Sequence, residues 1–235
     1  MIWGELMKNL AIIPARSGSK GLPDKNIKLL NNKPLMAYTI EVALKSKKYE
    51  QVVVSTDSEK YAKIAKKYGA HIPYIRSENL SNDTASTWDV VRDVLTYYKN
   101  KNIFYDTVSL LQPTSPFRKH QDIINAYNDF VEKDADTIIS VCEQTQSPLW
   151  CNTLPSDKSL TNFISKDVLN LPRQKLPTYY RLNGAIYIVK SNYIMNNFDI
   201  YNKNSYAYIM SKRNSIDIDD IEDFRYAEFL LNNTN

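Results

Sequence analysis

The residues best suited to chemistry in this chain lie near its N-terminus, where an apolar run ends in a loop rich in glycine and cations. Residues 10–15 have strand character, and the loop after them reads RSGSKGLPDKN. Glycine permits positive φ and a close approach of backbone to ligand. Successive backbone N–H groups in such a turn form an anion site, to which these cations add charge: Arg16, Lys20, Lys25 and Lys28. The loop predicts a site for a nucleoside triphosphate.

This loop matches neither of the common phosphate-binding fingerprints. No Lys-Ser or Lys-Thr follows a G-x-x-x-x-G spacing, and the G-x-G-x-x-G spacing is absent as well. Taken alone, the same residues also suit a surface loop with ordinary solvated lysines. The chemistry of the loop therefore depends on what the fold places opposite it.

An acidic segment near the C-terminus is the second candidate. In residues 215–220, period-two alternation predicts Asp217 and Asp219 on one face, with Ile216 and Ile218 on the other. Two carboxylates opposite a triphosphate loop are a usual way to hold Mg²⁺. The alternative is that the acidic residues favour the N-terminus of the helix predicted over 221–231.

Composition narrows the class of protein. The chain has 235 residues, 43% of them hydrophobic, and a net charge of +4, which fits one domain over 1–235 with a small excursion. No apolar stretch approaches the roughly 20 residues of a membrane span, and no RNA-binding aromatic motif accompanies the mild charge, so neither membrane nor nucleic acid is an expected partner.

Histidine and cysteine are scarce. Two histidines and two cysteines exclude a zinc cluster and argue against histidine-based catalysis. Because no secretion signal is apparent, they indicate a reducing cytoplasm. Met7 directly precedes the first predicted strand, so residues 1–6 are open to being an upstream-start artefact.

Strands and helices alternate along the chain. The apolar patterns predict strands at 10–15, 51–54, 71–75, 107–111, 137–141, 184–189 and 206–210, and helices at 35–46, 60–68, 84–100, 121–133 and 221–231. This order predicts an α/β fold: a three-layer, doubly wound, mainly parallel sheet with helices on both faces.

Ligands in such sheets sit at the carboxyl ends of strands. The polar segments expected to meet there are 16–26, 55–57, 112–116 and the residues after Val141. Asp57 also has a second interpretation, as the cap of the helix that follows it.

The alternation lapses over residues 144–182, which contain four prolines among aromatic and polar residues. A structureless loop of this length is unusual within a compact domain, and its apolar content is high for a disordered segment, the alternative interpretation. We expect a dimerisation excursion that packs on a second copy of the chain.

Several distinctive blocks occur in order over nearly the whole chain: IPARSGSKG at 13–21 with Lys25-Asn26, VSTD at 54–57, LSNDTAS at 80–86, LLQPTSP at 110–116, RQKLP at 173–177, NGAIY at 183–187 and SIDID at 215–219. Together these blocks resemble one enzyme family, the acylneuraminate cytidylyltransferases or CMP-sialic acid synthetases, including their legionaminate and pseudaminate types.

The resemblance implies a reaction in which CTP and a free nonulosonic acid give the CMP-sugar and pyrophosphate. It implies a Rossmann-like nucleotidyltransferase fold, Mg²⁺ as the metal with Mn²⁺ as the alternative, and a homodimer whose excursion completes the partner's sugar site. Some family members carry a lysine where this chain reads SPLW at 147–150. N-Acetylneuraminate, legionaminate and pseudaminate therefore all stay open as substrates.

The resemblance also implies residue roles. Lys25, Arg16 and Asp217 would be catalytic, with Lys25 stabilising charge at the α-phosphate. The expected nucleotide contacts are Arg16, Ser19, Lys20, Lys25, Asn26, Arg76, Asp83, Ala85 and Thr87. Gln112 and Tyr187 would contact the sugar acid, assisted by an Arg173 that the partner chain could supply. Asp217 and Asp219 would bind the metal, and whether Asp217 doubles as a base stays open.

Two alternative functions stay open. One is a synthetase for the shorter 3-deoxy-manno-octulosonate, which shares the fold and the CTP chemistry. The other is a non-catalytic nucleotide-binding protein on the same fold, which the intact set of Arg16, Lys25, Asp217 and Asp219 disfavours.

Overall fold

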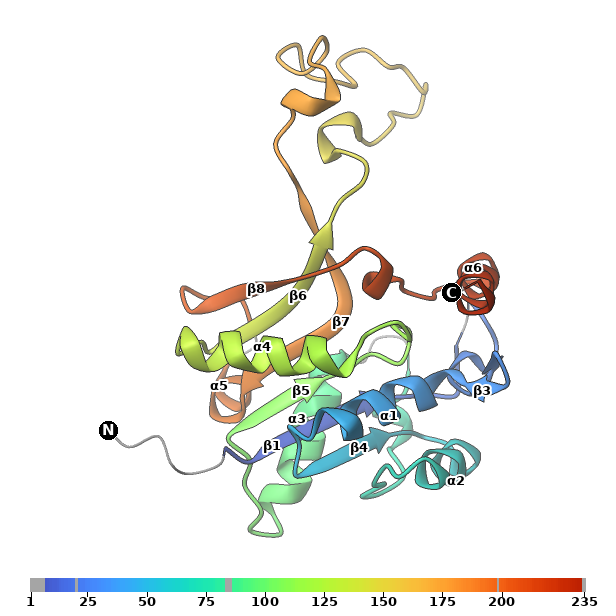
Figure 1. The fold of residues 1–235 in the computed structure, drawn as a ribbon, viewed down its shortest axis with the longest axis vertical. Coiled ribbons are helices and arrows are strands. Elements are labelled where there is room, and N and C mark those ends of the chain that lie inside the picture. Colours follow the sequence, from blue (N-terminus) through green and yellow to red (C-terminus); the bar gives the residue numbers. More distant parts are fainter. Residues whose placement is uncertain (1–6, 20, 83–85, 198, 234–235) are drawn as a thin grey trace.

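A six-stranded sheet forms the centre of the molecule (Figure 1). The computed structural model describes residues 7–19, 21–82, 86–197 and 199–233. The sheet has the order β4-β1-β5-β7-β6-β8. Its strands are β1 (Asn9–Pro14), β4 (Gln51–Ser55), β5 (Thr107–Leu110), β6 (Thr137–Glu143), β7 (Tyr180–Lys190) and β8 (Ser205–Met210).

The sheet is mainly parallel, as predicted, with one exception. β7 runs antiparallel to both of its neighbours, β5 and β6, whereas the other pairings are parallel. The reason lies in the connection: the chain leaves β6 and returns directly as β7, with Glu143 opposite Tyr180. A parallel return would require a crossover over one face of the sheet.

Helices cover both faces, which gives the predicted three layers. α1 (Leu35–Ser46), α2 (Glu59–Lys67) and α4 (His120–Glu132) share one buried cluster with the sheet. α3 (Thr87–Lys99) and α5 (Ser191–Asn196) share the cluster on the opposite face. The near-continuous apolar strands follow from this arrangement, because both faces of the sheet are buried.

Three predicted elements differ clearly from the structure. The strand predicted over 184–189 begins at Tyr180, because residues 180–182 pair with β6, and the excursion predicted over 144–182 therefore ends at 179. α3 begins at Thr87 rather than 84, because Ser86 and Asp89 form a capping box there. The strand predicted over 71–75 is wrong: the segment makes a single bridge, between His71 and Val53. Pro73 follows within two residues, and it has no N–H to donate to a continuing ladder.

The C-terminal helix packs on the N-terminal part of the chain. α6 (Ile221–Asn232) shares a buried cluster with Leu22 of the cationic loop and with Leu30 of the small hairpin β2 (Leu29–Leu30) and β3 (Lys33–Pro34). Ile218, fully buried, belongs to the same cluster. This packing brings the acidic segment around Asp217 beside the cationic loop.

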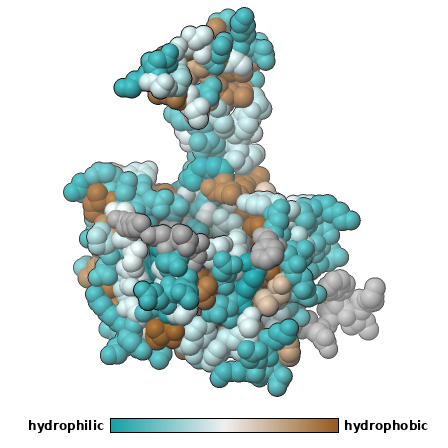
Figure 2. All heavy atoms as spheres, turned by 180° about the vertical axis from the view of Figure 1, so that it is seen from behind, coloured by the Kyte–Doolittle hydropathy of each residue, from teal (hydrophilic) through white to brown (hydrophobic). Residues whose placement is uncertain are grey.

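The segment between β6 and β7 projects from the body as an arm, residues 144–179 (Figure 1, top). Its only helical elements are two short 3-10 helices, η3 (Pro148–Trp150) and η4 (Arg173–Lys175), and the rest consists of turns and irregular chain. Several large apolar side chains on it are exposed: Leu154, Leu160, Leu169 and Leu171. Brown patches are visible on the projecting arm in Figure 2. Within the described residues, every helix is too short or too polar to cross a membrane.

Candidate active site

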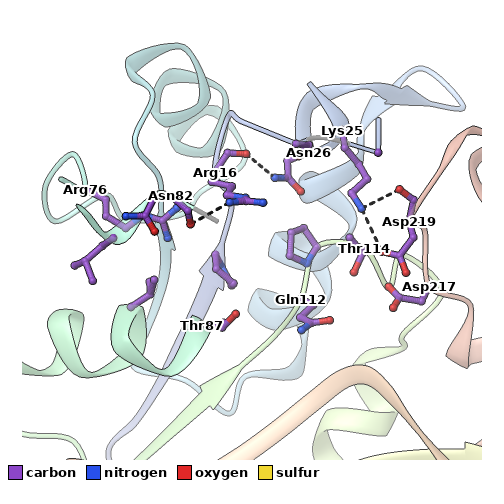
Figure 3. A pocket seen from close by; sticks show the side chains of 16 residues that line it. Arg16, Lys25, Asn26, Arg76, Asn82, Thr87, Gln112, Thr114, Asp217 and Asp219 are labelled. Carbon is purple, nitrogen blue, oxygen red and sulfur yellow. Dashed lines mark hydrogen bonds and ion pairs between the residues drawn. The ribbon is translucent and has the colours of Figure 1, made fainter. Parts of the chain in front are cut away.

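A cavity of about 620 Å³ opens at the carboxyl ends of β1 and β5. Figure 3 shows Arg76, Asn82 and Thr87 along one side and Lys25, Asp217 and Asp219 along the other. Nine of the predicted site residues line it: Arg16, Ser19, Lys25, Asn26, Arg76, Thr87, Gln112, Asp217 and Asp219. The structure therefore brings the cationic loop, the exit of β5 and the acidic segment into one crevice, whereas the predicted exit at 55–57 does not line it.

Lys25 links the loop to the acidic segment. Its Nζ donates to the carbonyl oxygen of Ile218 at 2.8 Å and lies 3.4 Å from Oδ1 of Asp219. Gly21 makes the close approach possible, because a Cβ there would lie 2.8 Å from the carbonyl oxygen of Asp219. Lys25 is largely buried, with 13% of its side chain exposed, while the Asp219 carboxylate is open to solvent.

Asp217 is the more enclosed of the two carboxylates. Its Oδ1 is buried and has no hydrogen-bond partner, and burial raises the pKa of this carboxyl while a hydrogen bond from Thr114 and the charge of Lys25 oppose the rise. The segment is held by the neighbouring backbone, since the Ile218 N–H donates to the carbonyl oxygen of Thr114 at 2.9 Å. Asp217 lines the polar crevice, and a carboxylate oxygen without a hydrogen-bond partner among the described residues suits a cation.

The described residues contain no cluster of three or more histidine, cysteine, aspartate or glutamate side chains that could hold a metal by themselves. Asp217 and Asp219 offer two carboxylates. Mg²⁺ is commonly held by one or two carboxylates together with substrate phosphates, so the donor set fits a metal that arrives with a nucleotide. The acidic cluster divides accordingly: Asp220 and Asp223 form the capping box of α6.

The opposite side of the cavity is shaped by two arginines. Arg16 donates to the carbonyl oxygen of Asn82 at 3.1 Å. Arg76 is only 5% exposed and donates to Oγ of Ser81 at 3.1 Å. Burial lowers the pKa of Arg76, and the negative charge of Asp57 counteracts the shift. Three predicted contacts of this side, Lys20, Asp83 and Ala85, lie outside the described residues.

The floor of the cavity depends on a residue that the sequence did not single out. Arg118 is fully buried and donates to the carbonyl oxygens of Gln112, at 2.6 Å, and Ala185, at 2.8 Å. Gly184, at φ +70°, allows the Gln112 side chain to lie against β7, since a Cβ there would collide with Oε1 of Gln112. These contacts fix the position of Gln112 at the exit of β5.

Two predicted sugar contacts lie away from the cavity lining. Tyr187 on β7 packs edge-on against Trp88, with ring centroids 5.8 Å apart. Arg173 lies on the arm, where its guanidinium donates to the carbonyl oxygen of Thr145 at 2.7 Å. The fourth expected strand exit, after Val141, does not reach the crevice either, because β6 continues into the arm.

Asn82 and Thr114 line the cavity although they were not predicted as contacts. Thr114 lies in the QPTSP block at the exit of β5, so its position in the chain was a usable signal. Asn82 likewise lies in the LSNDTAS block at 80–86, but its residue type did not predict the contact, because Arg16 binds its backbone carbonyl oxygen.

Comparison with known proteins agrees with this geometry. The mainly parallel sheet with a cationic loop at its carboxyl edge defines a nucleotidyltransferase of the α/β type. A family model described as cytidylyltransferase matches residues 10–234. The chain belongs to the cytidylyltransferase family, and its resemblance to the acylneuraminate members is confirmed.

Two relatives and one solved structure show how far the likeness extends. A CMP-N,N'-diacetyllegionaminic acid synthase of Legionella pneumophila is 39% identical over 96% of this chain and 97% of its own length. An N-acylneuraminate cytidylyltransferase of Escherichia coli is 40% identical over 94% of this chain, which spans 51% of that protein. A CMP:2-keto-3-deoxy-manno-octonic acid synthetase structure matches 96% of this chain and 98% of its own, with a TM-score of 0.72 and 17% identity, which shows the fold alone.

Proposed function

We propose that this protein transfers the cytidylyl group of CTP to a nonulosonic acid, giving the CMP-sugar and pyrophosphate. The observation that carries the proposal is the meeting of Lys25, Asp217 and Asp219 at one side of a cavity whose other side holds Arg16 and Arg76. The names of the two relatives, a legionaminic acid synthase and an N-acylneuraminate cytidylyltransferase, support a substrate of this class.

The triphosphate lies along the cationic loop in this proposal. Arg16 and Lys25 bind its oxygens, together with Ser19, Asn26 and Lys20, while Arg76 and Thr87, with Asp83 and Ala85, frame the cytosine and ribose. The anomeric hydroxyl oxygen of the sugar acid attacks the α-phosphorus, and the bond to the leaving pyrophosphate breaks. Attack at phosphorus needs positioning and charge neutralisation more than covalent catalysis, which suits a site built without histidine.

A divalent metal fits the two carboxylates. Asp217 and Asp219 would hold Mg²⁺, or Mn²⁺, which would neutralise phosphate charge and increase the acidity of the sugar hydroxyl. Lys25 remains the residue of this chain that stabilises negative charge at the α-phosphate. Its contacts to Ile218 and Asp219 hold it beside the metal ligands before a substrate binds.

The sugar acid enters on the Gln112 side. Gln112 contacts it there, and Tyr187 lines the pocket after a small rearrangement of the β7 side. Arg173 is too remote on its own arm to help the cavity of the same chain, so we assign it to the site of a partner subunit in a homodimer. We place the protein in the cytoplasm, because its proposed substrate CTP is available there.

Release of pyrophosphate from CTP tests the proposal. Release should require both Mg²⁺ and a sugar acid, and a panel of N-acetylneuraminate, legionaminate, pseudaminate and 3-deoxy-manno-octulosonate identifies the substrate. Binding of CTP with no release for any of these acids would favour a nucleotide-binding protein without this activity. Turnover of the eight-carbon acid alone would favour the octulosonate synthetase instead.

A further inference from the structure

The connection between β4 and α2 touches the nucleotide site at several points without lining the cavity. The carbonyl oxygen of Ser55 accepts from the Ala15 N–H at 2.9 Å, and that of Thr56 accepts from the Arg76 N–H at 2.8 Å. Ser58 is the N-cap of α2. The interpretation of Asp57 as the cap is therefore wrong, and its carboxylate has another partner.

That partner is the cationic loop. Oδ1 of Asp57 accepts from the Ser17 N–H at 2.8 Å, and Oδ2 accepts from the Ser17 hydroxyl at 3.0 Å. One carboxylate thus receives both donors of a single residue. Hydrogen bonds to an ionised acceptor are stronger than neutral ones, and two of them fix orientation as well as position.

The other end of the loop is attached to α2 itself. Asp24 has left-handed backbone geometry, with φ 54°, and its carboxylate accepts from the Tyr61 hydroxyl at 2.9 Å and from Nζ of Lys60 at 3.2 Å. The hydrogen bond from Tyr61, followed by that from Lys60, lowers the pKa of Asp24. Tyr61 is itself almost fully buried against the sheet, so this attachment is to a fixed point.

The two attachment points are the sequence neighbours of the two cations. Ser17 follows Arg16, and Asp24 precedes Lys25. A carboxylate near a triphosphate repels it, so Asp57 and Asp24 are poor choices for direct contact, and neither lines the cavity. Their position is explained if they hold the loop while protein donors compensate their charge.

We propose that Asp57 and Asp24 are positioning residues, which anchor the loop to the β4–α2 connection and to α2 and set the separation of Arg16 and Lys25 before the nucleotide binds. The inference rests on the proposed function for the identity of the nucleotide. Preorganised donors bind a ligand without the cost of ordering the loop on arrival. The contact of Asp57 positions Arg16, so its loss should mainly weaken CTP binding. The contact of Asp24 positions Lys25, so its loss should mainly lower kcat.

The anchors are first tested on the full-length protein without ligand. Hydrogen exchange of the Ser17 amide should be slow in the wild type and at least about tenfold faster in Asp57→Ala, because the backbone donor loses a charged acceptor. Asp57→Asn, which keeps one acceptor oxygen, should restore part of the protection. Unchanged exchange in Asp57→Ala would overturn the anchor.

The consequence for function is tested by CTP titration and steady-state kinetics. Asp57→Ala should raise the Kd for CTP about tenfold, with partial rescue in Asp57→Asn, and Tyr61→Phe should lower kcat about threefold with little change in CTP affinity. Tyr105→Phe is the matched control, because it deletes a hydroxyl bonded to Gln51 at 3.1 Å at the opposite end of β4.

The outcomes separate this inference from the proposed function. If the wild type binds CTP and the Asp57 and Tyr61 variants change only melting temperature, as the Tyr105 variant does, the positioning role is overturned and the function stands. If the wild type does not bind CTP, the proposed function fails, and the role assigned to the anchors fails with it even where the exchange result holds.

Discussion

The cationic loop and the arm are two irregular stretches of the chain, and they are stabilised in different ways. The loop is bonded to distant parts of its own chain: Ser17 to Asp57, Asp24 to Tyr61, and Lys25 to Ile218. The bonds of the arm are local by comparison, such as Asn152 to Phe163 and Arg173 to Thr145. Its large apolar side chains remain exposed.

This difference suggests that the body and the arm contribute different parts of the proposed site. In the proposed site, one chain supplies the nucleotide side, because its described charged groups are held by contacts within the body. The arm carries Arg173 away from its own cavity and presents a surface of exposed leucines: Leu154, Leu160, Leu169 and Leu171. Exposed apolar patches mark interaction surfaces. In the proposed homodimer, the partner subunit covers these leucines.

The largest expected effect is on the nucleotide side, at Asp217. Asp217→Asn should abolish turnover, because the metal loses a charged ligand, and yet raise the free energy of unfolding in metal-free buffer by about 0.5–2 kcal/mol. Burial raises the pKa of this carboxyl, so the ionised form costs stability at neutral pH. The advantage of the variant over the wild type should vanish as pH falls through the folded-state pKa. Thermal unfolding at several pH values measures this stability difference. A variant less stable than the wild type at pH 7 would contradict the stabilising effect expected from removing the buried charge.

Lys25→Ala should follow, with a loss well over tenfold in kcat/KM, where each factor of ten corresponds to about 1.36 kcal/mol of transition-state stabilisation. Lys28→Ala is a control from the same loop, because Nζ of Lys28 lies over the Phe224 ring, 5.5 Å from its centroid, and does not line the cavity. Steady-state kinetics compare kcat/KM of the two variants, and only the Lys25 variant should show the loss. Near-normal turnover in the Lys25 variant would exclude it as the group that stabilises the α-phosphate.

Gly184→Ala should affect the sugar side alone. The added Cβ would displace the Gln112 side chain, so KM for the sugar acid should rise about fivefold to tenfold while CTP affinity is unchanged. The positive φ of +70° adds strain, with a stability loss of about 1–2 kcal/mol. Equal losses of affinity for both substrates would show that the two sides of the cavity are not separable.

The smallest effect on the isolated site is expected from the arm surface. Leu160→Ser should weaken self-association, measured by sedimentation, and leave CTP binding within about twofold of the wild type, because no nucleotide contact lies on the arm. Lys158→Ser is a polar control on the same segment. A wild-type protein that is monomeric and fully active would refute the shared site.

Local pattern predicted the layers and the positions of most elements. The helix over 35–46 has the predicted bounds, since its apolar spacing and its burial coincide. The antiparallel direction of β7 was not predictable, because strand direction depends on how the arm leads the chain back. The choice between Asp57 and Ser58 as helix cap is also invisible in sequence: both residue types cap helices, and contact with Ser17 across the fold decides.

Residue type and chemistry predicted that Lys25, Asp217 and Asp219 would meet, and they line one cavity; their roles stay predictions. Arg118 was missed because an arginine after a proline-rich loop resembles a surface residue, and only the structure shows its burial beneath Gln112. Arg173 is an intermediate case. Its block was noticed through family resemblance, but its distance from its own cavity depends on the direction of the arm.

Mixing two inactive variants tests the division between the body and the arm most directly. In a dimer of Lys25→Ala with Arg173→Ala chains, one site carries both defects and the other carries neither. After subunit exchange, an equal mixture should therefore recover up to about one quarter of wild-type pyrophosphate release. Each variant alone should stay nearly inactive. If the mixture gives no more activity than the sum of the separate variants, although subunit exchange is shown, the arm does not complete the site of its neighbour.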